Sequence, residues 1–193
     1  MTTPLARALS IFGHPMLVLP LAVLAALAQG ERQAALQAAI GFGLFAALVM
    51  AFSWWQVRRG RWAHVDASAR HERSSLNRFL LVALAVSALL VGASGTQPLL
   101  ALGLALSAAM ILVAMVMARW CKVSLHLAFA IFAALLLREL GTVWMLGALA
   151  FAAAVAWSRL ALQRHTPLDL VAGAIIGAFA GVAFWPIAPH WTG

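Results

Sequence analysis

Long apolar runs constrain this sequence more than any other feature. A helix needs about 17–25 mostly apolar residues to cross the hydrocarbon core of a bilayer. The 193-residue chain holds seven candidate runs, at residues 13–29, 35–57, 79–95, 98–119, 124–138, 140–158 and 168–189. Hydrophobic residues make up 65% of the chain and charged residues only 9%, whereas soluble domains carry roughly 25% charged residues. The chain is therefore predicted to fold in lipid.

The predicted secondary structure of these runs is helical. Inside lipid every backbone N–H and C=O must be paired within the protein, and the runs show no strand-like alternation. We expect an all-α, polytopic transmembrane bundle of six or seven spans, folded as a single domain over residues 1–193. The first run is expected to be a span and not a signal peptide, because Pro15 and Pro20 interrupt it. Tryptophans lie mostly near the ends of runs, as in an interfacial belt: Trp54, Trp55, Trp62, Trp120, Trp144, Trp157, Trp185 and Trp191.

The net charge of +8 is predicted to gather at one face of the bundle. Counting spans from the loop at residues 58–78 returns the polar segments 119–124 and 159–165 to the same side, hereafter the site face. Eleven of the 13 Lys and Arg residues lie at this face, all except Arg32 and Arg138. The positive-inside rule then places the site face in the cytoplasm. No nucleic-acid partner is expected, because the basic residues flank spans and form no amphipathic surface.

The segment SRLALQRHTPLD, residues 158–169, places costly charge just before the last apolar run. Thr166 is expected to cap the last helix. Asp169 then lies four residues after His165 on the same face, where its carboxylate can accept a hydrogen bond from the imidazole and fix its tautomer. Such a histidine can act as a nucleophile or general base, and the Arg159 guanidinium suits phosphate oxygens. Taken alone, the segment is equally compatible with an interfacial anchor beside a capped helix.

Residues 122–126, Lys-Val-Ser-Leu-His, form a second polar cluster at the site face. Ser124 is expected to cap the helix that follows, where its hydroxyl and nearby N–H groups can bind an anion. Lys122 adds positive charge. His126 lies two residues into an apolar helix, where an unpaired imidazole is costly. It is interpreted as a general acid that protonates a leaving oxygen, the alternative being a buried histidine bonded to a backbone carbonyl.

Together these residues resemble the signature motifs of the type 2 phosphatidic acid phosphatase family, which is related to the vanadium haloperoxidases. The third motif is complete, at Ser158, Arg159, His165 and Asp169. Arg164 has no position in it, and we expect it to be an interfacial anchor. The second motif, Pro-Ser-Gly-His, is partial, because the chain keeps its Ser and His but has Val and Leu in place of Pro and Gly.

The first motif of that family, a Lys, six residues, then Arg-Pro, is weak in this chain. Only its Arg is kept, at Arg73, and Asp66 stands where the motif has Lys. Arg70, Arg61 and Lys122 are alternative replacements for the missing Lys. The resemblance covers about residues 66–179.

The resemblance implies a bacterial-type integral membrane lipid phosphatase, placed in the inner (plasma) membrane of a bacterium, that works without a metal or other cofactor. His165 would attack phosphorus and form a phosphohistidine, with Asp169 orienting its ring. His126 would protonate the leaving alkoxide, and water would then cleave the phosphoenzyme. The phosphate oxygens would be held by Arg159, Ser124, Lys122 and Arg73. The sequence offers no carboxylate cluster suited to magnesium, and a lone Cys121 excludes a cysteine-based zinc site.

The expected substrate is a phosphomonoester or diphosphate of a lipid whose tail stays among membrane lipids. Phosphatidic acid, phosphatidylglycerol phosphate and polyprenyl phosphates all qualify. Two alternatives remain open, a lipid phosphotransferase on the same scaffold and a catalytically degenerate membrane transport or assembly protein. A vanadate-dependent oxidase is disfavoured by the membrane setting. The sequence leaves assembly as a homo-oligomer open.

Overall fold

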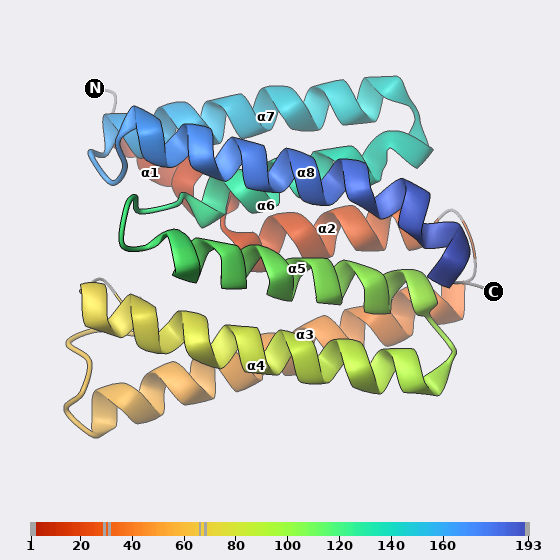
Figure 1. Cartoon of the computed structure of the whole chain (residues 1–193), viewed down its shortest axis with the longest axis horizontal. Coiled ribbons are helices and arrows are strands. Elements are labelled where there is room, and N and C mark those ends of the chain that lie inside the picture. The colour runs from red at the N-terminus through yellow and green to blue at the C-terminus, as the bar shows by residue number, and fades with distance from the viewer. Residues whose placement is uncertain (1–2, 29, 31, 66, 68, 192–193) are drawn as a thin grey trace.

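The chain folds as a bundle of helices that run side by side along one axis (Figure 1). The structure, a computed structural model, describes residues 3–28, 30, 32–65, 67 and 69–191, with only the backbone of Thr3, Arg70, His190 and Trp191. Regular structure in these residues is helical throughout, which confirms the all-α prediction: α1 (Thr3–Phe12), α2 (Pro15–Leu27), α3 (Arg32–Arg58), α4 (Arg70–Ser94), α5 (Pro98–Met117), α6 (Leu125–Leu136), the 3₁₀ helix η1 (Leu137–Leu140), α7 (Thr142–Ala161) and α8 (Pro167–Trp191).

The lengths of these helices match a multi-pass membrane protein. Among the described residues, five helices are long and apolar enough to cross a bilayer, and six if α1 and α2, which meet at a 53° bend, form one span. The run expected at 124–138 is shorter than a crossing, because α6 ends at Leu136 and its 12 residues extend only about 18 Å. The structure therefore supports six spans but not seven of full length.

The core of the bundle lies where α8 packs against α6. Gly173, Gly177 and Gly181 form a stripe along α8 that lets the two backbones come close. A Cβ at position 173 would lie 2.6 Å from the Ser124 carbonyl oxygen, and one at position 177 would collide with the carbonyl of Ala128. The stripe is a packing feature of the kind that membrane helices use for close contact.

The start of α4 differs from the sequence prediction. The run was expected to begin at residue 79, but α4 begins at Arg70, so nine residues of the expected loop, all polar except Leu76, are helical. Glu72, only 1% exposed, explains this difference. Its carboxylate accepts hydrogen bonds from the backbone N–H of Ala63 (2.6 Å) and of Ala69 (2.8 Å). The same carboxylate thus fastens the α3–α4 loop and caps the first turn of α4.

Trp62 in this loop is also placed differently from the expectation of an interfacial anchor. It is 4% exposed, and its ring packs edge-on against Phe52 of α3, with 5.6 Å between centroids. Trp54, Trp55 and Trp120 do lie exposed at the ends of helices, each beneath the guanidinium of a neighbouring arginine. These exposed pairs fit the predicted aromatic belt.

The loops that carry the polar clusters meet at one end of the bundle. In Figure 1 the turns after α3, α5 and α7 all lie at the left end, and α1 lies toward the same end. The turns after α4 and η1 lie at the opposite end. Counting spans along the sequence therefore predicted the site face correctly.

Candidate active site

The candidate site is built around the start of α8, which begins immediately after a tight loop. Thr166 and Asp169 bond reciprocally there: the Thr166 backbone N–H donates to Asp169 Oδ2 (2.9 Å), and the Asp169 backbone N–H donates to Thr166 Oγ1 (3.3 Å). This is a capping box, which satisfies N–H groups that a helix start leaves unpaired. Thr166 is therefore the N-cap, as predicted, and the loop holding His165 is tied to the first turn of α8.

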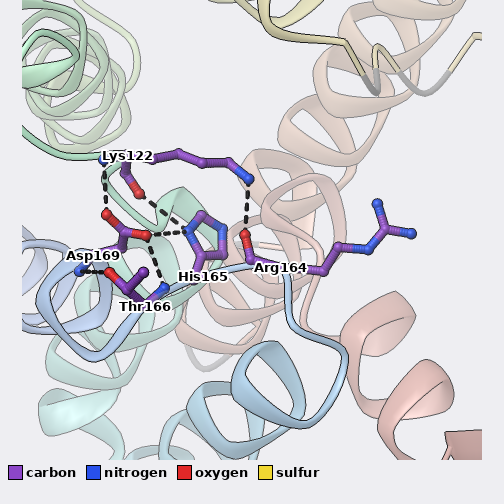
Figure 2. Close-up of polar contacts among 5 residues, drawn as sticks. All are labelled: Lys122, Arg164, His165, Thr166 and Asp169. Carbon is purple, nitrogen blue, oxygen red and sulfur yellow. Dashed lines mark hydrogen bonds and ion pairs between the residues drawn. The ribbon is translucent and has the colours of Figure 1, made fainter.

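The carboxylate of Asp169 also holds the loop between α5 and α6. Its Oδ1 accepts the backbone N–H of Lys122 at 2.8 Å, and the Asp169 backbone carbonyl accepts the N–H of Ser124 at 3.1 Å. Asp169 is 5% exposed, so these bonds are sheltered from water. One residue thereby connects two segments that are more than forty positions apart in the sequence, as Figure 2 shows.

The imidazole of His165 lies between Lys122 and Asp169 (Figure 2). Its Nδ1 is 3.1 Å from the Lys122 carbonyl oxygen and 3.7 Å from Asp169 Oδ2. A carbonyl can only accept, so Nδ1 carries the proton and Nε2 keeps its lone pair. Asp169 was expected to fix the tautomer of His165. Its carboxylate does lie beside the ring, but the shorter contact, which fixes the tautomer, is with the backbone carbonyl of Lys122.

The surroundings of His165 favour its neutral form. Burial lowers the pKa of His165 to about 4, and the positive charges of Arg159 and Lys122 act in the same direction. Burial also lowers the pKa of the Lys122 ammonium, helped by repulsion from Arg73 and Arg159. The site therefore combines a neutral imidazole with several cations close together. A bound anion would offset the repulsion between these cations.

Ser124 stands at the N-cap position of α6, but its hydroxyl does not cap the helix. The residue is fully buried, and its Oγ has no hydrogen-bond partner among the described residues. Buried hydroxyls are nearly always paired, so an orphan one needs an explanation. Ser124 is not among the residues that line the cavity described below, so a bound anion as the partner of its hydroxyl stays a prediction. By contrast, the Ser158 hydroxyl donates to the Val155 carbonyl at 2.7 Å and has a structural role.

Arg159 extends from the last turn of α7 toward the N-terminal helix. Its Nη1 donates to the Ser10 hydroxyl of α1 at 2.6 Å, whereas its buried Nε has no partner among the described residues. His126, in the first turn of α6, packs edge-on against His14, with 5.1 Å between ring centroids. Ser10 and His14 were not assigned to the site from sequence. The only available signal was that His14 precedes a span at the site face.

The candidates for the first motif are only partly described. Arg73 lies in the first turn of α4, one residue after Glu72, and lines the same cavity as His165. Asp66 lies outside the described residues, as does the side chain of Arg70. Arg164 also lines the cavity. Its backbone carbonyl accepts a hydrogen bond from the Lys122 ammonium at 2.8 Å. Its side chain extends away from His165 in Figure 2.

A cavity of about 1070 Å³ opens at these residues and runs into the bundle. Its wall at the site face includes Arg73, Lys122, His126, Arg159 and His165. Farther in, the wall becomes apolar, with Leu19, Phe45, Leu80, Leu104, Ile111 and Phe129, and Gln37 and Gln97 lie at the other end. In the described part of the chain, no three His, Cys, Asp or Glu side chains gather closely enough to hold a metal ion.

Comparison with known protein families finds a match in the C-terminal part of the chain. The family model described as the PAP2 superfamily matches residues 105–192. No curated protein and no solved structure matches the chain. The matched region contains both the loop before α6 and the α7–α8 loop, while α1 to α4, with His14 and Arg73, lie outside it. This superfamily has phosphatase-type or phosphotransferase-type activity on phosphate esters. Over residues 105–192, the chain is therefore similar to the PAP2 superfamily.

Proposed function

We propose that this protein is a membrane lipid phosphatase that hydrolyses a phosphomonoester or diphosphate of a lipid through a phosphohistidine at His165, without a metal ion. The observation that carries the proposal is the neutral His165, with Nδ1 held by the Lys122 carbonyl, at the charged mouth of a cavity whose inner wall is apolar. One cavity would thus hold the nucleophile and the phosphate at its mouth and the apolar tail of the substrate farther in.

In the first step the Nε2 lone pair of His165 attacks phosphorus. The ester P–O bond breaks as the N–P bond forms, and the leaving alkoxide takes a proton from His126. In the second step water attacks the phosphoryl group and gives its proton to His126. The N–P bond breaks, and inorganic phosphate leaves. Hydrolysis of a diphosphate follows the same steps, with a lipid phosphate as the leaving group.

The phosphoryl oxygens are held by the cations and the orphan hydroxyl. Arg159 Nε and Ser124 Oγ are buried atoms without a partner in the described residues, and a phosphate oxygen would satisfy each of them. Lys122 and Arg73 add positive charge at the same cavity wall. Fixed donors and cations aimed at developing negative charge commonly supply the largest part of catalysis.

The apolar part of the cavity supports a lipid as the substrate. The wall between α2, α4, α5 and α6 consists mainly of Leu, Phe, Ile and Val side chains. An acyl or prenyl chain placed there would stay out of water, as it does in the bilayer, while its phosphate lies at the site face. A soluble phosphate ester would leave this wall unused.

The test is phosphate release by the purified protein in detergent, with a chelator present, across a panel of lipid phosphates. We expect hydrolysis of at least one lipid phosphate and inhibition by vanadate. His165→Ala should abolish release, while His64→Ala should retain it, because His64 is an exposed histidine in the α3–α4 loop. Hydrolysis by His165→Ala at the wild-type rate would exclude the phosphohistidine route. Phosphate transfer to a lipid alcohol in preference to water would instead support a phosphotransferase.

We further propose that the site face is cytoplasmic, as supported by the 11 of 13 Lys and Arg residues predicted at that face. Single cysteines placed at His64 and Thr96, in a chain whose Cys121 is replaced by Ser, report the two faces. An impermeant thiol reagent on intact cells should label position 96 and spare position 64. Labelling of position 64 alone would reverse the orientation.

A further inference from the structure

The corner between α1 and α2 lies against the candidate site, although it is outside the region matched by the PAP2 superfamily. Gly13 in this corner is buried because it is pressed against α7. A Cβ at position 13 would collide with the Val155 side chain and lie 2.9 Å from the Leu9 carbonyl oxygen. Only a residue without a side chain allows this approach. The corner is therefore fixed on the helix that carries Arg159.

Two polar side chains of this corner reach residues of the site. The Ser10 hydroxyl accepts a hydrogen bond from Arg159 Nη1 at 2.6 Å. The His14 ring meets the His126 ring edge to face, at an interplanar angle of 90° and a centroid separation of 5.1 Å. His14 also lines the same cavity as His126 and His165. These contacts come from a segment that the motifs of the C-terminal half do not include.

The tautomer of His14 is set by the start of α2. Its Nδ1 accepts the backbone N–H of Met16 at 3.2 Å and thereby caps the helix. A nitrogen that accepts a hydrogen bond carries no proton, so the neutral ring has its proton on Nε2. Protonation of Nδ1 would break the cap. The capping bond therefore keeps His14 neutral and its ring orientation fixed beside His126.

We propose that His14 is a positioning residue for catalysis, which holds the His126 ring in the orientation needed to protonate the leaving oxygen. This inference rests on the proposed function of His126 as the general acid. Edge-to-face packing of aromatic rings is favourable beyond the area it buries, so the contact favours one orientation of the His126 ring. Among the described residues, the ionisable groups that act on His126 are Arg159, His14 and His165, and His14 is the one whose ring packs against it.

The consequence depends on the leaving group. Protonation by a general acid matters most when the leaving oxygen is strongly basic, as in an alkyl or lipid phosphate. It matters little for an aryl phosphate such as p-nitrophenyl phosphate, whose leaving group is stable as an anion. A misplaced His126 should therefore slow the first class of substrate and spare the second.

The experiment compares His14→Asn with the wild type, using His64→Asn as the matched control. Asn is among the best N-caps, so the variant preserves the start of α2 and removes only the ring. His126 also takes the proton from water in the second step, which both substrates share, so the two are compared by kcat/KM, which reports only the steps up to formation of the phosphohistidine. We expect His14→Asn to lower kcat/KM for a lipid or alkyl phosphate by about tenfold or more, part of the 10²–10⁴ that general acids supply. kcat/KM for p-nitrophenyl phosphate should stay within about twofold, since general acid catalysis contributes little there. His64→Asn should match the wild type on both substrates.

A loss of equal size on both substrates, or no loss on either, would overturn the inference. Failure of the proposed function is distinguishable, because it would appear as a wild type without phosphate release. A second readout needs no turnover, namely ¹⁵N side-chain spectra of the six histidines, with His126 assigned by its substitution. We expect the Nε2–H tautomer for His14 and a shifted His126 signal in His14→Asn. An unchanged His126 signal would contradict the contact.

Discussion

Replacing Asp169 with Asn should reduce catalysis without removing any atom that touches the substrate. The two carboxylate oxygens hold different backbone donors, Lys122 N at 2.8 Å and Thr166 N at 2.9 Å. An Asn side chain keeps one acceptor and turns its NH₂ toward the other donor, which loses one bond and leaves a buried N–H unpaired. Hydrogen bonds to charged groups are worth about 1.5–3 kcal/mol.

That free energy holds the Lys122 carbonyl against His165, so its loss should lower the population of the reactive arrangement. At about 1.4 kcal/mol per tenfold, kcat should fall by about 10- to 150-fold in Asp169→Asn. The Asp169→Ala variant loses both hydrogen bonds, so its kcat should fall further, by about 10²- to 10⁴-fold.

The assay is phosphate release under saturating lipid phosphate, with thermal unfolding in detergent measured in parallel. Glu139→Gln is the matched control, because Glu139 is an exposed carboxylate in η1 at the opposite end of the bundle. Wild-type kcat in Asp169→Asn, or equal losses in the Asn and Ala variants, would refute this account of how Asp169 acts.

Three further predictions concern packing, protonation and the α3–α4 loop. Gly177→Ala should lower the free energy of unfolding by about 1–3 kcal/mol through overpacking. Gly147→Ala should not, because a Cβ at position 147 meets nothing within 4 Å. Thermal unfolding of both variants in detergent checks this. NMR titration should give His165 a pKa of about 4, so that the ring stays neutral at pH 5.5. Because an unfolded histidine binds its proton near pH 6.5, this shift contributes stability that is lost as the pH falls from about 6.5 to 4. A His165 pKa near 6.5 would contradict the burial described. Glu72→Gln should loosen residues 59–69, detected as faster trypsin cleavage there, and unchanged cleavage would argue against Glu72 as the fastening group.

The fold could be predicted from the sequence to the extent that it follows from apolar runs. Length and hydropathy identified the long helices, and counting them placed the three polar clusters at one face. The start of α4 could not be predicted in this way, because the first turns of that helix are polar and depend on the buried carboxylate of Glu72. α1 was missed because ten residues are too few to cross a bilayer.

The site was predictable where it depends on neighbours in the sequence. The spacing of His165 and Asp169 predicted their proximity, and Thr166 was identified as the N-cap. The hydrogen bond from His165 Nδ1 to the Lys122 carbonyl could not be foreseen, since it joins two loops through a backbone group, which leaves no mark in the sequence. His14 and Ser10 were missed for a related reason, because their contacts with His126 and Arg159 arise only from the packing of α1 and α2 against α6 and α7.

The central claim is that His165 carries the phosphoryl group during turnover. The most direct measurement is rapid alkaline quenching of the purified protein during hydrolysis of a ³²P-labelled lipid phosphate, followed by mapping of the labelled peptide. The account predicts label on the peptide containing His165, with neither label nor phosphate release in His165→Ala. Label on a different residue, or phosphate release by His165→Ala at the wild-type rate, would contradict it.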